Sequence, residues 1–167
     1  MNINLLENAL EKNNVEEVER LITEISSHQH NEVVPVLIKH ITLTEKPGIR
    51  NALAIALRDI GNEKMVSPLI DLINDPKTLG SRGTLLYALE PFNCTEHLET
   101  IVQQFLTGNF EVQAMAYQLL ESMNGKVPAD VLLKSLQKVK EQLNEIERQQ
   151  ELHTDVLDFL FNMNETY

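Results

Sequence analysis

The sequence has little of what builds tight turns. Of its 167 residues six are Gly and six are Pro, Trp is absent, and aromatic residues make up 5%. This scarcity, beside abundant Leu, Ile, Ala, Glu and Gln, argues against many short strands and favours helices. Apolar residues at 43% and charged residues at 23% are typical of a folded chain and argue against intrinsic disorder.

Cysteine is nearly absent as well. Cys94 is the only one, so an intrachain disulfide is excluded and a reducing compartment is expected. The first residues, MNINLLENALEKNN, lack a basic region followed by a long apolar run, so we expect no signal peptide. No apolar run approaches the ~20 residues of a membrane span. We therefore predict a cytoplasmic protein with no membrane partner.

Basic residues are outnumbered. Lys and Arg total 14 against 25 Asp and Glu, a formal net charge of -11. Because phosphates would be repelled, this charge argues against a nucleic-acid or anionic-lipid partner, and it is compatible with a basic protein partner. The two ends are acidic: residues 1–45 carry 8 acids and 3 bases, residues 111–167 carry 10 and 5, and residues 46–80 carry 4 and 5.

What the chain does contain is a repeat of 31–32 residues. Leu21, Leu53 and Leu85 fall in register after shifts of 32, and a shift of 31 adds Ala116. Five further apolar columns agree: Ile25, Leu57, Leu89 and Leu120; Val34, Val66 and Leu98; Leu37, Leu69, Ile101 and Leu132; Ile38, Ile70, Val102 and Leu133; Ile41, Ile73, Phe105 and Leu136. The spacing within each half of a unit is helical and never alternates as in a strand.

Each unit is therefore a helical hairpin that cannot bury its apolar face alone. Stacked hairpins share a continuous core, so we predict an all-α fold, a right-handed α-solenoid of antiparallel helical hairpins. The predicted single domain spans residues 1–167, with an N-terminal capping helix in 1–14, four hairpins in 15–140 and a C-terminal helical extension in 141–167. The four hairpins are expected at 15–42, 48–74, 81–107 and 110–140.

The stretch IRNALAIALRDIG at 49–61, followed by VSPLIDLI at 66–73, resembles the short HEAT-like repeat of phycobilin lyase-type proteins and bacterial scaffolds. The resemblance covers about residues 15–140 and is strongest at 47–75. It implies that Arg50 and Arg82 bond the turn before their helices, where Glu45 and Asp75 lie. It specifies the fold better than the function, since HEAT-like arrays serve many purposes.

The C-terminal extension has two interpretations. Leu136, Val139, Leu143 and Ile146 follow at spacings of 3 and 4, as in a coiled-coil seam of two heptads, which is fewer than the three or four that indicate one safely. The favoured interpretation is an overlong helix whose apolar stripe is covered by a short helix at 151–163 that folds back as a cap. Left unpaired, this segment would be a patch for self-association or for another protein.

Residues that carry chemistry form no recognised motif. His28 and His30 lack a third metal ligand at a diagnostic spacing, so no metal site is predicted. Cys94 lies beside a helix start that could lower the pKa of its thiol, but no His belongs to it in a nucleophile motif. GxGxxG, P-loop, GxSxG and HExxH motifs are absent. We predict no catalytic residue and no cofactor. With 25 Asp and Glu residues, the sequence does not exclude a catalytic pair of carboxylates.

The second helices of such arrays line the inner curve, where we expect partners to bind. The predicted binding ridge consists of Lys39, His40, Asp71, Gln103, Gln104 and Lys134. It is mixed and polar, and it lacks the bases and stacking rings of a nucleic-acid channel.

These observations favour a non-enzymatic protein–protein interaction scaffold. A more specific hypothesis is an acidic bacterial protein of the immunity or inhibitor type that masks a basic toxin or enzyme. The alternative, which the resemblance implies, is a lyase or chaperone acting on a tetrapyrrole or another small ligand, and it needs an apolar groove with a placed acid or base. A DNA glycosylase of the HEAT type is disfavoured by charge and by the aromatic-poor ridge.

Overall fold

A computed structural model describes residues 3–12, 14–26 and 31–163 of the chain. Over these residues the fold is all-α, with helices packed as adjacent pairs and no strand. The chain divides into two compact units, Met1–Val127 and Pro128–Tyr167. The predicted fold class, a helical repeat array, is confirmed.

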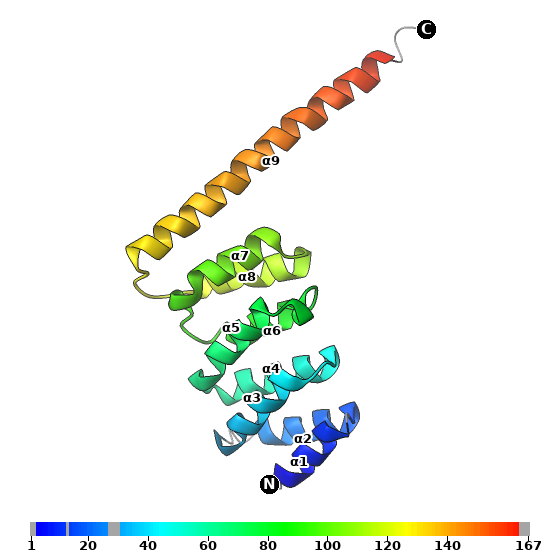
Figure 1. The fold of residues 1–167 in the computed structure, drawn as a ribbon, viewed down its shortest axis with the longest axis vertical. Coiled ribbons are helices and arrows are strands. Elements are labelled where there is room, and N and C mark those ends of the chain that lie inside the picture. The colour runs from blue at the N-terminus through cyan, green and yellow to red at the C-terminus, as the bar shows by residue number, and fades with distance from the viewer. Residues whose placement is uncertain (1–2, 13, 27–30, 164–167) are drawn as a thin grey trace. The chain divides into compact units, whose positions relative to one another are not determined.

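The first unit is a stack of helix pairs (Figure 1). Its helices are α1 (Ile3–Glu11), α2 (Val15–Ser26), α3 (Val34–Leu43), α4 (Pro47–Ile60), α5 (Val66–Asn74), α6 (Gly83–Leu89), α7 (Leu98–Thr107) and α8 (Phe110–Ser122). Short 3-10 turns precede α3, α5, α6 and α7. Among consecutive helices, the closest contacts join α1 with α2, α3 with α4, α5 with α6 and α7 with α8 (Figure 1).

The repeat columns form the core of this unit. In the first helices, Leu53, Leu57, Leu85 and Leu89 are fully buried. In the second helices, Leu37, Leu69 and Ile101 are equally inaccessible. The first helices of successive hairpins contact one another, α2 with α4, α4 with α6 and α6 with α8, so each column becomes a continuous apolar seam. Burial of these side chains supplies most of the driving force for stacking.

The turn inside the second hairpin shows how local sequence ends one helix and starts the next. Gly61 closes α4 with φ of 74°, a left-handed conformation that glycine adopts without a steric penalty. The Asn62 side chain then accepts a hydrogen bond of 3.0 Å from the Lys64 amide and so caps the following turn. Asn62 also donates to Asn31 Oδ1 at 2.8 Å, 31 residues earlier, which ties two repeats together.

The second unit differs from the expected fourth hairpin. Its helix α9 (Ala129–Met163) runs for 35 residues without a break, so the helix expected to end near residue 140 continues to Met163. The predicted short helix at 151–163 does not exist as a separate element, because it is the last part of α9. The physical reason is that residues 129–163 contain no Gly and no Pro, so nothing in the local sequence stops the helix.

The apolar columns also end differently here. Leu132, Leu133 and Leu136 occupy the columns that are buried in the earlier hairpins, yet all three are exposed on α9. Among the described helices, none combines the length and apolar composition that crossing a membrane requires.

Candidate functional site

Only some residues of the predicted binding ridge are exposed to solvent. Lys39 on α3 and Asp71 on α5 are exposed, and Gln103 on α7 is half-buried. Helices α3 and α5 contact each other, so Lys39 and Asp71 lie on neighbouring helices of the same row. Lys39 is positive and Asp71 is negative, so their charges cancel and this row of helices has no net charge from the pair.

Gln104 lies inside the fold. It is buried, and its side-chain oxygen accepts a hydrogen bond of 3.0 Å from Arg82 Nη1. The same column contains Leu72, which is also buried, so the apolar residue at this position was the signal that the column faces inward. Gln104 therefore positions Arg82 and offers nothing to a partner.

Lys134 belongs to α9 in the second unit, where it is exposed. The ridge that the sequence predicts as one row is thus divided between two compact units. Within the first unit, the members that a partner could reach are Lys39, His40, Asp71 and Gln103.

The two arginines at equivalent positions bond the preceding turn, as the resemblance implies. Arg50 Nη2 donates to the Thr44 carbonyl at 3.0 Å, and Arg82 Nη2 donates to the Asp75 carbonyl at 3.1 Å. In both cases the acceptor is a backbone oxygen and not the nearby carboxylate. Arg82 is further held by Thr78 Oγ1 at 3.2 Å. Both side chains therefore have structural contacts.

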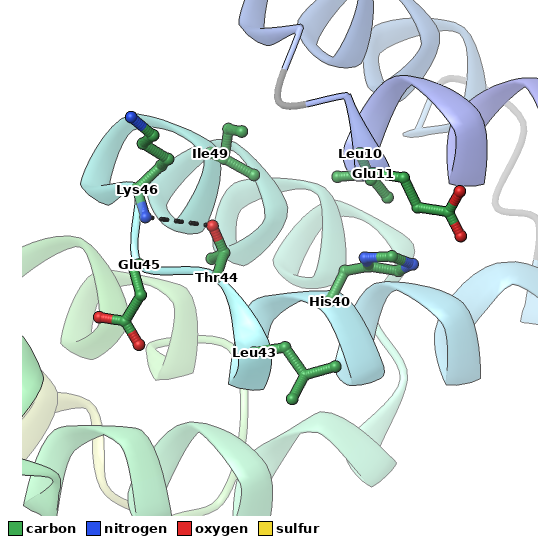
Figure 2. Close-up of a pocket in the computed structure, with 8 residues that line it drawn as sticks. All are labelled: Leu10, Glu11, His40, Leu43, Thr44, Glu45, Lys46 and Ile49. Atoms are coloured by element: carbon green, nitrogen blue, oxygen red, sulfur yellow. Dashed lines mark hydrogen bonds between the residues drawn. The ribbon is translucent and has the colours of Figure 1, made fainter.

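A pocket of about 400 Å³ lies at the N-terminal end of the first unit. Figure 2 shows the His40 ring on α3 turned towards Leu10 and Glu11 on α1. The rest of the lining comes from the end of α3, the following loop and the start of α4: Leu43, Thr44, Glu45, Lys46 and Ile49. The pocket thus combines an apolar floor with one imidazole and charged groups of both signs.

His40 stays neutral at neutral pH. Partial burial lowers the pKa of its ring, and the charge of Lys39 acts in the same direction, whereas Glu7 and Glu11 act against it. Its Nε2 atom is buried and has no hydrogen-bond partner among the described residues. A neutral imidazole in this position can donate or accept one hydrogen bond to a ligand.

No group of three or more His, Cys, Asp or Glu side chains that could hold a metal ion occurs in the described part of the chain. His28 and His30 lie outside the described residues. Cys94 is fully buried, and burial raises the pKa of its thiol to about 11. The expectation that a helix start could lower this pKa is therefore wrong, because desolvation of the thiolate dominates.

The sequence reasoning missed an exposed aromatic stripe on α8. Phe110 is 87% exposed, and Tyr117, seven residues later, is half exposed. Residues seven apart lie on the same helix face, and Ala114 between them completes this face. The Tyr117 hydroxyl donates to Glu121 Oε1 at 2.8 Å, which adds a carboxylate one turn further on. We call Phe110, Ala114, Tyr117 and Glu121 the α8 stripe.

The α8 stripe lies in a stretch of the first unit whose charged residues, apart from histidine, are all acidic. Between Arg82 and Lys126 the sequence has no Lys or Arg, but it has five acids: Glu90, Glu96, Glu99, Glu111 and Glu121. One signal in the sequence could have revealed the stripe: Phe110 precedes the apolar columns of its repeat, so the period leaves it without a core position.

Comparison with known proteins agrees with the repeat. The profile of the family described as HEAT repeats matches residues 3–90, more than half of the chain. No curated protein and no solved structure matches the sequence.

Proposed function

The chain belongs to the HEAT repeat family, and on this basis we propose that its first unit is a scaffold that binds a basic protein through the α8 stripe. HEAT repeats generally act as scaffolds for protein–protein interaction. The finer statements, the sign of the partner's charge and the face that binds it, are inferences from the side chains of α8 and its surroundings.

The single observation that carries the proposal is the exposure of Phe110. Phe110, which is 87% exposed, and the half-exposed Tyr117 share one face of α8 and together form an exposed aromatic surface, the kind of feature that marks an interaction site. Aromatic side chains dominate the binding energy of protein interfaces, where each such residue contributes about 2 kcal/mol or more when it enters a partner's pocket. Tyr117 is held in place by its bond to Glu121 and by a ring contact of 6.3 Å with Phe105.

Charge supports a basic partner. The stretch between Arg82 and Lys126 has five acids and no Lys or Arg, so its field attracts positive charge and repels phosphates. Such complementarity raises the association rate and selects against acidic competitors. A protein of the immunity or inhibitor type, which masks a basic toxin or enzyme, is the specific version of this function that we propose.

The experiment compares two surfaces of the same unit. The tagged protein is used to capture partners from cells that express it, at low and moderate salt, with mass spectrometry of the retained proteins. We expect one basic protein in near-equal amount, released as salt rises. The double variant Phe110→Ala/Tyr117→Ala should weaken this binding by at least about 100-fold.

The matched control is Lys39→Ala/Asp71→Ala, which changes the exposed part of the ridge and should leave the affinity within about threefold. Thermal unfolding of both variants shows whether the fold is kept. If the ridge variant abolishes binding and the α8 variant does not, the ridge is the binding face and the proposed surface is wrong.

A second candidate function rests on the His40 pocket. Its volume of about 400 Å³ is within the range of small-ligand sites, and it supplies the apolar groove with a placed acid and base that a tetrapyrrole-binding role needs. Titration of the protein with haem or a bilin, followed by absorbance, tests this role. A flat titration, or a shift that His40→Ala and Leu43→Ala leave unchanged, rules it out.

A further inference from the structure

The apolar residues of helix α9 follow the spacing of a coiled coil over a longer stretch than the two heptads from Leu136 to Ile146. Because the helix is unbroken over 35 residues, the apolar spacing of 3 and 4 runs through three consecutive heptads and returns in the fifth, which reaches the three or four that indicate a coiled coil. With heptad positions a to g counted from Ala129, the a positions are Ala129, Leu136, Leu143, Gln150 and Leu157. The d positions are Leu132, Val139, Ile146, His153 and Leu160.

This seam is uncovered within its own unit. The seven large apolar side chains at a and d, from Leu132 to Leu160, are between 38% and 58% exposed. On the opposite face, the c positions include the apolar Val131, Leu152 and Phe159, whereas positions b and f are all polar: Asp130, Lys134, Gln137, Glu141, Asn144, Arg148, Glu151, Asp155, Asp158 and Asn162. A single amphipathic helix without packing is only marginally stable in water. Since α9 has no break, it cannot fold back to cover its own seam.

We infer that the α9 seam binds second copies of this chain, in a parallel, in-register coiled coil. The inference does not depend on the function proposed for the first unit. Two features of α9, the polar layer in the seam and the residues that flank it, favour this occupant and this orientation.

The polar layer is Gln150 and His153, one at an a and one at a d position. In a parallel, in-register assembly each faces its own copy, so amide meets amide and the two Gln150 side chains can exchange hydrogen bonds, while the His153 rings meet each other rather than an apolar side chain. In an antiparallel pair that keeps the apolar seam together, Gln150 would face Ile146 and His153 would face Leu143. A polar group buried against an apolar side chain is costly, so an antiparallel pair that overlaps along the whole of α9 is disfavoured.

The His153 ring has a defined orientation on α9. Its Nδ1 atom lies 2.6 Å from the Gln149 carbonyl one turn earlier. Because a carbonyl only accepts, Nδ1 is the donor in this bond. The Nε2 atom is the one that remains to meet a neighbouring copy.

The residues at the flanking e and g positions also favour the parallel orientation. A parallel register brings Gln142 next to Glu147, Gln149 next to Thr154 and Val156 next to Phe161 of the neighbouring copy, and none of these pairs joins like charges. The antiparallel register would place Glu147 against Glu147, which repels. The ion pair of α9 between Arg148 and Glu145, at 2.8 Å, lies outside the seam and does not compete with it.

An anionic bilayer is a poorer occupant. Helix α9 has seven acids and only four bases, so its net charge is negative and opposes binding to anionic lipid. A copy of α9 brings a matching seam, a matching polar layer and compatible flanks. Leu at a with Val or Ile at d in the two heptads from 136 to 149 favours three or four strands over two.

The consequence would be multivalency. In a parallel coiled coil the N-terminal ends of all copies of α9 are at the same end, so the first units are attached together there. A partner with several sites, or several linked partners, would then be held by more than one first unit, which can raise the apparent affinity by about 10²–10⁴.

The test uses the full chain and sedimentation equilibrium over a range of concentrations. We expect a mass of two to four times 19.0 kDa for the wild type. Leu143→Glu, which puts a charge into the seam, should raise the dissociation constant at least about 100-fold. Asn144→Glu makes the same side chain at the adjacent outer position and should leave the mass unchanged. Thermal unfolding of both variants checks that the first unit stays folded.

Orientation is read from disulfide cross-linking. Val139→Cys places a thiol at a d position, and under oxidation it should link two chains only if the helices are parallel and in register. Asn144→Cys, on the outer face, should not cross-link. Native Cys94 does not interfere because it is fully buried. A mass of 19.0 kDa at every concentration, or assembly that Leu143→Glu leaves intact, overturns the proposal. An assembly in which Val139→Cys fails to cross-link overturns the parallel register.

Discussion

Arg58 and Glu90, which are 32 residues apart, form an ion pair of 2.9 Å between Nη2 and Oε2. The Arg58 guanidinium also lies 4.3 Å from the centre of the Tyr87 ring. One side chain of α4 thus contacts two residues of the next hairpin, and the separation of the pair is the period of the repeat. This contact joins repeats by polar atoms, beside the apolar columns that join them in the core.

The first prediction concerns the strength of that pair. A double-mutant cycle with Arg58→Ala and Glu90→Ala should give a coupling energy of about 0.5–1 kcal/mol, because both groups retain contact with solvent. The measurement is urea unfolding at low salt and at about 1 M salt, where screening should reduce the coupling. A coupling that stays constant with salt would show that packing against Tyr87, and not charge, holds Arg58.

The second prediction compares a glycine in the left-handed conformation with a glycine of ordinary φ. Gly61 has φ of 74° and open space around its Cα, so Gly61→Ala should cost about 1–2 kcal/mol for the backbone alone. Gly48, in the first turn of α4, also has open space but an ordinary φ, so Gly48→Ala should stabilise by about 0.4–1 kcal/mol. Urea unfolding measures both, and changes of the same sign would contradict the assignment.

The third prediction contrasts two arginines that occupy the same repeat position. Arg50 is 1% exposed, yet its Nε and Nη1 atoms have no partner among the described residues. Replacing it by Met keeps the unbranched stem as far as the position of Nε and removes the unpaired polar atoms, so Arg50→Met should change the free energy of unfolding by less than about 1 kcal/mol.

The matched variant is Arg82→Met. All three guanidinium nitrogens of Arg82 are bonded, to Thr78, Gln104 and the Asp75 carbonyl. This variant should cost about 2–3 kcal/mol, since it also leaves Gln104 buried without its partner. Equal losses for Arg50→Met and Arg82→Met would mean that the unpaired atoms of Arg50 have partners in solution.

The fourth prediction is the pH dependence that Cys94 causes. Its thiol has a pKa of about 11 in the folded chain against an ordinary value of 9.0, because burial disfavours the thiolate. The unfolded chain loses this proton first as pH rises. Stability is therefore complete below about pH 9 and falls by about 2–3 kcal/mol as pH approaches 11.

The measurement compares wild type with Cys94→Ala between pH 8 and pH 11. Tyr and Lys titrate equally in both proteins, so the difference isolates Cys94. The native thiol should also react with a disulfide reagent far more slowly than the denatured one. Parallel stability curves, or rapid labelling of the folded protein, would contradict the burial of Cys94.

Where sequence reasoning failed, it failed over the direction in which a side chain points. The phase of the repeat predicts Gln104 on the binding ridge, but the presence of Leu72 in its column already indicates the inside of the fold. Arg82 makes the burial of that amide tolerable by donating to it. The α8 stripe is missing from the predicted ridge because that ridge lies on the second helices of the repeat, whereas α8 is a first helix.

The sequence by itself determined the period and the helical character of the chain, because apolar spacing and helix-ending residues such as Gly61 act over a few neighbours along the chain. Only the tertiary structure decided that Arg82 is fully bonded while Arg50 is not, and that Phe110 is exposed. It also decided that Leu132 and Leu136 stay uncovered on α9 although they continue the buried columns. The reason is that a period says which side chains share a face, whereas burial requires a second surface, and that surface comes from residues far away in the sequence.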